Sequence, residues 1–347
     1  CRRLLVRVAR YQAEKQMTAE TKPQARVLVT GSRGKSSIVR LLHTAMNSQG
    51  LNTYSRITGV VPRELGPNGI RAISRSAGAH VEEMRWWLRR VPVSARGIVL
   101  ENSAISAEFQ SLARRWLRPA VTVLTNTLPD HQELWGTSSA GAAEVLVAGV
   151  PKNARLVLPA ELGSDEYLME LLRHRRCQLI FSEPAGEAGE GYRAVNTGLA
   201  LTTLECLGFD TAPALKAMLD IPFDRYDIHV ARCGGAEVAM ALSANDITST
   251  RNLFRSLMWS KAETRIIYNH RADRPGRFRS FVEWLGQAHW REVLIIGDKP
   301  RKRPGSARYL KIDNEQGLLR LFQPGDRVFG CGNIAGIPLS LVALLGR

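Results

Sequence analysis

A short glycine-containing loop near position 31 carries residue types that bind phosphate. Its sequence, Gly31-Ser32-Arg33-Gly34-Lys35-Ser36-Ser37, follows an apolar run and precedes residues at helical spacing. Backbone N–H groups at a strand-to-helix turn, the helix N-terminus and a lysine can together hold a triphosphate. Lys35 would neutralise the β- and γ-phosphates, and Ser36 would offer its hydroxyl to Mg²⁺. The loop lacks the longer spacer of the usual phosphate-binding loop, so an ordinary turn with a solvated lysine is the alternative.

Two further groups of polar residues each follow an apolar run. Glu101 comes directly after one run, and Asn126, Asp130 and His131 come after the next. The carboxyl ends of parallel strands meet at one sheet edge, where open α/β sheets bind ligands. Glu101 is therefore a candidate Mg²⁺ ligand, although a capping or solvated carboxylate would explain it when taken alone. Three such strand ends at one edge are much harder to explain as simple turns.

Short apolar segments alternate with segments of helical spacing along the first two thirds of the chain. This alternation predicts an α/β fold with a parallel sheet that is covered by helices on both faces. The expected strands are residues 26–30, 97–100, 121–124, 156–158 and 179–181, and the expected helices are residues 38–46, 108–116 and 196–207.

A second domain is expected after residues 220–228, where proline and paired charges interrupt the pattern. Alternation then restarts, with strands expected near residues 237–242, 264–268, 292–296 and 327–329. We therefore predict three parts. They are a basic N-terminal helix (1–25), a P-loop ATP-binding domain (26–226) and a smaller Rossmann-like α/β domain (227–347).

The composition indicates a basic, reduced protein. The 347 residues include 48 Lys plus Arg against 32 Asp plus Glu, a formal net charge of +16. Such a charge attracts nucleotides, acidic polymers, nucleic acid or anionic lipid. The five cysteines are scattered without a Cys-x-x-Cys pair, so they indicate neither a zinc site nor a redox site. No apolar run reaches the roughly 20 residues that span a bilayer.

The first residues interleave arginine with apolar side chains. Arg2, Arg3, Arg7 and Arg10 form this basic group. The pattern is typical of a helix on a membrane surface, and a surface helix packed on the protein body explains it equally well. Because the sequence begins with cysteine, there is room for an upstream anchoring segment.

The order of these motifs resembles that of the Mur ligase superfamily. The first part matches through Thr30–Ser37, Glu101, Thr125-Asn126 with Asp130-His131, and Asn196 opening an alanine- and leucine-rich helix. The second part matches through Ala244-Asn245-Asp246 with Ser249-Thr250, Asn269-His270-Arg271-Ala272-Asp273-Arg274 with Arg277, and Gly332-Asn333-Ile334-Ala335-Gly336. Within the superfamily the chain is most similar to the ligase subunit of capsular poly-γ-glutamate synthetase, whose members carry an arginine in the loop.

The resemblance implies roles residue by residue. The implied nucleotide-binding residues are Thr30, Gly31, Ser32, Arg33, Gly34, Lys35, Ser36, Ser37, Asn126, Asn196, Asn245 and Arg271. The implied catalytic residues are Lys35, Glu101, His131, Arg271, Asp273 and Arg274, and the implied metal ligands are Ser36, Glu101 and His131. Asn196 would lie near the adenine. A surface polar group or salt bridge explains Arg277 and Asn333 as well as function does.

One departure from the family pattern concerns the second metal. Many Mur ligases carry a lysine after the Asp-His pair that becomes carbamylated and helps to bind this metal. Residues 138–150 contain no lysine, and Lys152 does not clearly match in position. The expected cofactors are therefore ATP and Mg²⁺, with a second metal left open or held by carboxylate and imidazole alone.

The activity that the resemblance implies is ATP-dependent, ADP-forming ligation of a carboxylate to an amine through an acyl phosphate. The acid would be the end of a poly-γ-glutamate chain and the amine an incoming glutamate, for capsule or exopolymer synthesis. Such a ligase is expected at the cytoplasmic face of the cell membrane, as a homo-oligomer with a membrane-embedded partner subunit.

Three alternatives stay open at this point. A P-loop ATPase acting on nucleic acid is favoured by the basic charge, but no basic groove with interleaved aromatic residues and no recognition motif is present, so nucleic acid is not the expected partner. A scaffold subunit would bind nucleotide without turnover. A folylpolyglutamate or cyanophycin-type ligase would use the same chemistry on another substrate.

Overall fold

The computed structural model describes residues 25–345, except residues 60, 76–78, 137, 222–223, 225–229, 243 and 245. The chain divides into two compact units, Cys1–Ile221 and Pro222–Arg347. The domain boundary predicted between residues 226 and 227 falls on residues outside the described ones, as does the predicted basic helix up to residue 24.

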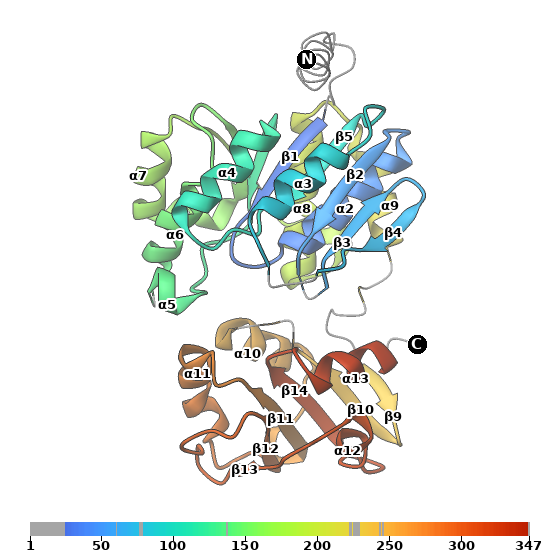
Figure 1. Ribbon diagram of the computed structural model, residues 1–347, viewed down its shortest axis with the longest axis vertical. Helices are drawn as coiled ribbons and strands as arrows, with labels where there is room; N and C mark the ends of the chain where they lie inside the picture. The colour runs from blue at the N-terminus through green and yellow to red at the C-terminus, as the bar shows by residue number, and fades with distance from the viewer. Residues whose placement is uncertain are drawn as a thin grey trace, which may run out of the picture. The chain divides into compact units, whose positions relative to one another are not determined.

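The first unit is built on an eight-stranded sheet with the order β4-β3-β2-β5-β1-β6-β7-β8 (Figure 1). The strands are β1 (Ala25–Thr30), β2 (Thr53–Ile57), β3 (Arg63–Gly66), β4 (Gly69–Ala72), β5 (Gly97–Glu101), β6 (Val121–Leu124), β7 (Arg155–Pro159) and β8 (Gln178–Ser182). Neighbouring strands are parallel, apart from the antiparallel pairs β2–β3 and β3–β4. The carboxyl ends of β2, β5, β1 and β6 therefore lie side by side.

Helices cover both faces of this sheet, which explains why strands β1, β5 and β6 are largely apolar. The helices are α2 (Lys35–Ser48), α3 (Glu82–Arg90), α4 (Ala107–Leu117), α5 (Gln132–Trp135), α6 (Ser139–Val147), α7 (Glu166–His174), α8 (Gly191–Cys206) and α9 (Thr211–Leu219). In β1, Val27 and Val29 pack with α2, α8 and α9, whereas Leu28 packs with α3 and α4 on the other face. Alternate side chains of one strand thus enter two different cores.

The second unit has a six-stranded sheet with the order β13-β12-β11-β14-β10-β9 (Figure 1). Its strands are β9 (Val230–Cys233), β10 (Ala236–Met240), β11 (Thr264–His270), β12 (Glu292–Gly297), β13 (Arg308–Tyr309) and β14 (Arg327–Gly332). Among the described strands of this second unit, only the β9–β10 pair is antiparallel. Its helices are α10 (Ile247–Ser256), α11 (Pro275–Leu285), α12 (Glu315–Leu319) and α13 (Ile337–Leu345).

The predicted α/β class is confirmed, with differences in its details. The sheets are mixed rather than purely parallel, because β3 and β4 form a hairpin and β9 pairs antiparallel to β10. The four side chains of β4 are exposed, so they carry no apolar signal. Asn196 does not open its helix, since α8 begins at Gly191. None of the helices in the described part of the chain is long and apolar enough to cross a membrane.

Candidate active site

Two glycines shape the loop between β1 and α2. Gly31 (φ 131°) and Gly34 (φ 81°) have backbone angles that other residues rarely adopt. A Cβ atom on Gly31 would lie 2.0 Å from Thr125 Oγ1, and one on Gly34 would lie 2.8 Å from Asn196 Oδ1. The loop backbone therefore approaches the end of β6 and the side of α8 so closely that only glycine fits. This approach also brings Asn196 to the predicted phosphate-binding loop.

The side chain of Asn126, just after β6, holds the loop backbone. Its Oδ1 accepts a hydrogen bond from the Arg33 amide at 3.1 Å, and its Nδ2 donates to the Arg33 carbonyl at 3.2 Å. Ser32 Oγ donates to the Leu128 carbonyl at 2.6 Å. Asn126, predicted to bind nucleotide, here shapes the loop that would do so.

Lys35 is the first residue of α2 and is half-buried. Its Nζ donates to the Gly31 carbonyl at 2.6 Å and to the Ser32 carbonyl at 3.1 Å. Burial lowers the pKa of Lys35, and the nearby Glu101 carboxylate opposes this effect. An ammonium has three donor hydrogens, so Lys35 can bridge the loop and an incoming phosphate oxygen.

Ser36 and Glu101 meet at the carboxyl edge of the sheet. Ser36 Oγ donates to Glu101 Oε2 at 2.8 Å, and Glu101 is only 4% exposed. Thr58, which follows β2, donates through its amide to Oε2 and through its hydroxyl to Oε1, both at 2.9 Å. The position of Thr58 was missed by the sequence analysis, because the polar residues Ser55 and Arg56 hide strand β2.

The Asp130–His131 pair lies beside the same loop. Arg33 Nη1 is 2.9 Å from Asp130 Oδ2, and His131 Nε2 is 3.7 Å from the same oxygen. Burial raises the pKa of Asp130, but the charges of Arg33 and then His131 outweigh it, and the net pKa lies below its usual range. His131 has a φ of 42° and its ring contacts Trp135, with centroids 5.1 Å apart. The structure thus groups the predicted metal ligands as Ser36 with Glu101, and His131 with Asp130.

Thr30 and Ser37 are the two ends of the predicted loop segment. Thr30 is fully buried, and its hydroxyl donates to Gln110 Oε1 at 3.2 Å. Gln110 also accepts from Asn102 Nδ2, the residue after Glu101. This network fixes the ends of β1 and β5 against α4. Ser37 lies in the first turn of α2 and is half-buried.

In the second unit, the predicted residues follow the carboxyl ends of the parallel strands. Arg271 pairs with Asp273 through two hydrogen bonds of 2.9 and 2.6 Å, just after β11. Arg274 directly precedes α11. Asn245, the remaining predicted nucleotide-binding residue of this unit, lies outside the described residues. Arg271, Asp273 and Arg274 therefore lie at the ligand-binding edge expected of an α/β sheet.

Two residues from the ends of strands in this unit bind each other and a residue of helix α11. Asn333 Nδ2 donates to the Asn269 carbonyl at 3.0 Å, and Asn269 Nδ2 donates to the Ala335 carbonyl at 2.9 Å. Arg277 of α11 donates to Asn333 Oδ1. The sequence left the roles of Arg277 and Asn333 open, and in the structure they join the ends of β11 and β14 to α11.

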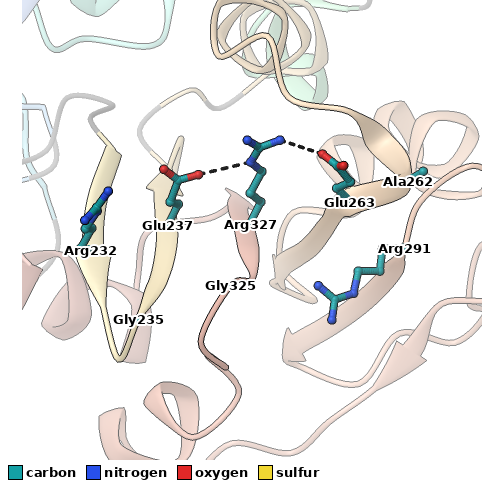
Figure 2. A pocket seen from close by; sticks show the side chains of 8 residues that line it. All are labelled: Arg232, Gly235, Glu237, Ala262, Glu263, Arg291, Gly325 and Arg327. Carbon is teal, nitrogen blue, oxygen red and sulfur yellow. Dashed lines mark hydrogen bonds and ion pairs between the residues drawn. The ribbon is translucent and has the colours of Figure 1, made fainter.

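A pocket with a volume of about 740 Å³ lies at the opposite, amino-terminal ends of β10, β11 and β14 (Figure 2). Its lining residues are Arg232, Gly235, Glu237, Ala262, Glu263, Arg291, Gly325 and Arg327. Arg327 pairs with Glu237 at 3.2 Å and with Glu263 at 2.7 Å. None of the predicted site residues lines this pocket, and its charges largely neutralise one another.

The donor atoms at the first unit's sheet edge suit Mg²⁺. Ser36 and Glu101 supply a hydroxyl and a carboxylate, the oxygen ligands that this hard cation prefers. Over the described residues, no three or more His, Cys, Asp or Glu side chains cluster in a way that could hold a metal ion. Few protein ligands are typical of a Mg²⁺ that is bound jointly with substrate phosphates and water.

A glycine-shaped phosphate loop at the edge of a largely parallel sheet, with a buried carboxylate at the next strand end, defines a nucleotide-binding α/β protein. The family model of the Mur ligase middle domain matches residues 29–239. The model described as the poly-gamma-glutamate synthase CapB C-terminal domain matches residues 228–347. The chain belongs to the Mur ligase family, and it is an ATP-dependent, amide-forming ligase.

Curated relatives resemble the chain over nearly its whole length. It is 25% identical to the PGA synthase CapB of Bacillus subtilis (strain 168) over 350 residues, which covers 91% of this chain and 89% of the relative. It is 24% identical to the capsule biosynthesis protein CapB of Bacillus anthracis over 353 residues, which covers 92% and 76%. The resemblance to poly-γ-glutamate ligases that the sequence motifs predicted is thus confirmed.

A solved structure shares the fold. MurF ligase from Thermotoga maritima, in complex with ADP, superimposes with a TM-score of 0.66 at 13% sequence identity. The match covers 93% of this chain and 79% of MurF. This confirms the predicted Mur-ligase-like architecture.

Proposed function

We propose that this ligase adds glutamate to the end of a poly-γ-glutamate chain, for capsule or exopolymer synthesis. The observation that carries the proposal is the joint match of residues 29–239 to a Mur ligase domain and of residues 228–347 to the CapB C-terminal domain. The hydrogen bond between Ser36 of the loop and Glu101 supports the proposal, because it brings together a hydroxyl and a carboxylate that suit Mg²⁺.

The reaction follows from the poor reactivity of a carboxylate. A carboxylate oxygen of the acid attacks the γ-phosphorus of ATP, and ADP leaves, so that an acyl phosphate forms. The amine of the incoming glutamate then attacks the acyl carbon and loses a proton, and phosphate leaves as the amide forms. The protein contributes mainly positioning and charge neutralisation. Lys35 supplies the positive charge next to the transferred phosphoryl group.

The metal proposed for this reaction is Mg²⁺, held by Ser36 and Glu101 together with phosphate oxygens. When bound, it would neutralise charge on the transferred group. His131, beside Asp130, is proposed as a further ligand at the same edge. A second metal is also proposed, but it would have no carbamylated lysine as a ligand. Helix α6 contains no lysine, and Lys152, which follows this helix, is exposed.

The polar residues at the strand ends of the second unit are proposed to act on the nucleotide and the acyl phosphate. Arg271 and Arg274 would supply positive charge, and Asp273 would orient Arg271, as it does in the structure. Asn196 would contact the adenine from α8. Asn245 is proposed for nucleotide binding from the sequence motif.

The proposed partners follow from the product. A growing polyanion that leaves the cell has to cross the membrane, so we propose a membrane-embedded partner subunit and a position for the ligase at the cytoplasmic face. The basic residues at the start of the sequence support this placement. We also propose that the ligase is a homo-oligomer.

A screen of acid and amine pairs for ADP release tests the proposal. ADP release should require both glutamate and a γ-linked glutamate oligomer, and DNA or RNA should have no effect. ADP release stimulated by nucleic acid would favour a P-loop ATPase, and ATP binding without ADP release under any substrate would favour a scaffold. Faster ADP release with a folate or with an aspartate–arginine polymer would instead favour a folylpolyglutamate or cyanophycin-type ligase.

A further inference from the structure

A buried arginine lies next to the proposed active site. Arg56 of β2 is only 1% exposed, and its Nη2 donates to Glu83 Oε2 at 2.8 Å. Its Nε and Nη1 are also buried, and neither has a hydrogen-bond partner among the described residues. Burying donors of a charged group without acceptors is costly, so Arg56 depends on the Glu83 carboxylate for its charge partner.

Glu83, in the first turn of α3, joins Arg56 to a second arginine. Arg75 donates to the same Glu83 oxygen through Nε at 3.0 Å and Nη2 at 2.7 Å. The other oxygen of Glu83 accepts the His80 amide at 3.1 Å. The Arg75 side chain is 24% exposed, so solvent reaches it. Two guanidinium groups that share one carboxylate leave a net positive charge at this point.

Strand β2 connects this cluster to Glu101 of the proposed active site. Arg56 precedes Thr58 by two residues on the chain, and Thr58 binds both oxygens of Glu101. In the sheet, Arg56 of β2 is paired in register with Leu100 of β5, the residue that directly precedes Glu101. Glu101 in turn contacts Ser36 of the phosphate loop.

The acid substrate of the proposed function carries an anion that does not react. The last residue of a γ-linked glutamate chain has a γ-carboxylate, which is activated, and an α-carboxylate only a few bonds away. A buried anion needs a charged partner, and arginine pairs with carboxylates in a planar, directional way.

We propose that Arg75, held in place by Glu83 and Arg56, binds the α-carboxylate of the glutamate residue whose γ-carboxylate is activated. This inference rests on the proposed function. Arg75 Nη1, which makes no hydrogen bond to the described residues, is the donor toward the substrate. Glu83 and Arg56 are positioning residues. The pairing fixes which carboxylate faces the phosphate loop and therefore selects γ-linkage.

The test compares two acid substrates that differ only in this carboxylate. One is a γ-glutamyl oligomer that ends in glutamate, and the other is the same oligomer ending in 4-aminobutyrate, which keeps the reacting carboxylate and lacks the α-carboxylate. ADP release gives KM and kcat for each oligomer with the parent enzyme and with Arg75→Ala. Arg71→Ala is the matched control, because Arg71 on the neighbouring strand β4 is 79% exposed and pairs with Glu64.

Arg75→Ala should raise KM for the glutamate-ended oligomer by about tenfold to a hundredfold, the range expected when a charge-assisted hydrogen bond is lost. KM for the aminobutyrate-ended oligomer and for ATP should stay unchanged, and Arg71→Ala should match the parent with both oligomers. Thermal unfolding and calorimetric binding of the oligomer separate a folding defect from a binding defect.

The outcomes separate this inference from the proposed function. Equal loss with both oligomers, or no loss with the glutamate-ended one, overturns the assignment of Arg75 while the proposed function stands. If the parent releases ADP with neither oligomer, the proposed function falls and the inference falls with it.

Discussion

Lys35 binds its own loop in the structure and is proposed to bind the transferred phosphate as well. Its ammonium is held by the carbonyls of Gly31 and Ser32, which water can bind equally well once the side chain is removed. Lys35→Ala should therefore change stability by only about 1 kcal/mol. Turnover should be abolished, because the transferred phosphoryl group loses its neutralising charge.

Glutamate-dependent ADP release and thermal unfolding measure these two effects. Lys152→Ala, at an exposed lysine outside the loop, is the control and should behave as the parent. Unchanged ADP release in Lys35→Ala would remove the phosphate-loop assignment.

Glu101 is the second residue whose substitution is informative. Glu101→Gln keeps the shape of the side chain and removes the negative charge that a hard cation requires. We expect the Mg²⁺ concentration for half-maximal ADP release to rise about tenfold, equivalent to about 1.4 kcal/mol. Glu108→Gln, at an exposed position of α4, should leave the Mg²⁺ titration unchanged. A titration of Glu101→Gln that overlays the parent would show that this carboxylate is structural.

At the scale of elements, strand β2 explains what the sequence could and could not predict. The strands with uniform apolar runs, such as β1, β5 and β6, were predicted because both of their faces enter cores. Strand β2, Thr53–Ile57, is almost as buried, yet it carries Ser55 and Arg56. Their partners are supplied by distant parts of the fold, such as His43 for Ser55 and Glu83 for Arg56. No local pattern reveals such pairing, so β2 and the Thr58 contacts after it were missed.

The sequence predicts those parts of the candidate site that follow directly from the ends of parallel strands. The order of the parallel strands brings Ser36, Glu101 and Asp130 to one edge, and apolar periodicity alone suffices to place them there. The detailed contacts depend on backbone geometry instead. Asn126 holds the loop through two backbone groups of Arg33, and Asn196 meets Gly34 from the middle of α8. A motif indicates which residues are candidates for the site, but not which partner each of them contacts.

The ion pairs of Glu83, which join β2 to α3, also predict that the free energy of unfolding depends on pH. Burial raises the pKa of Glu83, but the Arg75 hydrogen bonds, the His80 amide and the charges of Arg75 and Arg56 outweigh it, so the folded-state pKa lies below its usual value. The unfolded chain therefore binds more protons in acid. The stabilisation by Glu83 is complete above the unfolded pKa of about 4.3 and is lost as the pH falls through the folded-state pKa.

Glu83→Gln should lower the free energy of unfolding by about 3 kcal/mol at neutral pH, because Arg56 then stays buried without its carboxylate. Urea unfolding at neutral pH and again below about pH 4 measures this, and the difference from the parent should shrink in acid. Glu82→Gln, one residue earlier and paired only with the partly exposed Arg85 among the described residues, is the control. A difference that stays constant across this pH range would contradict the assigned ion pairs.

At the scale of the whole molecule, the excess of basic residues affects how the protein captures its substrate. A net charge of +16 raises the local concentration of a polyanionic substrate and speeds its capture, an effect that salt screens.

The basic residues at the start of the sequence predict that the protein binds to anionic membranes. Arg2, Arg3, Arg7 and Arg10 should each contribute about 1 kcal/mol on a surface of anionic lipid. In co-sedimentation with anionic vesicles at low salt, the intact chain should pellet and a chain lacking residues 1–20 should not. Physiological salt should weaken the binding, because the Debye length shortens to about 8 Å. If both chains pellet equally, or neither does, these arginines do not provide membrane attachment, and any association has to come from a partner subunit or from a segment upstream of residue 1.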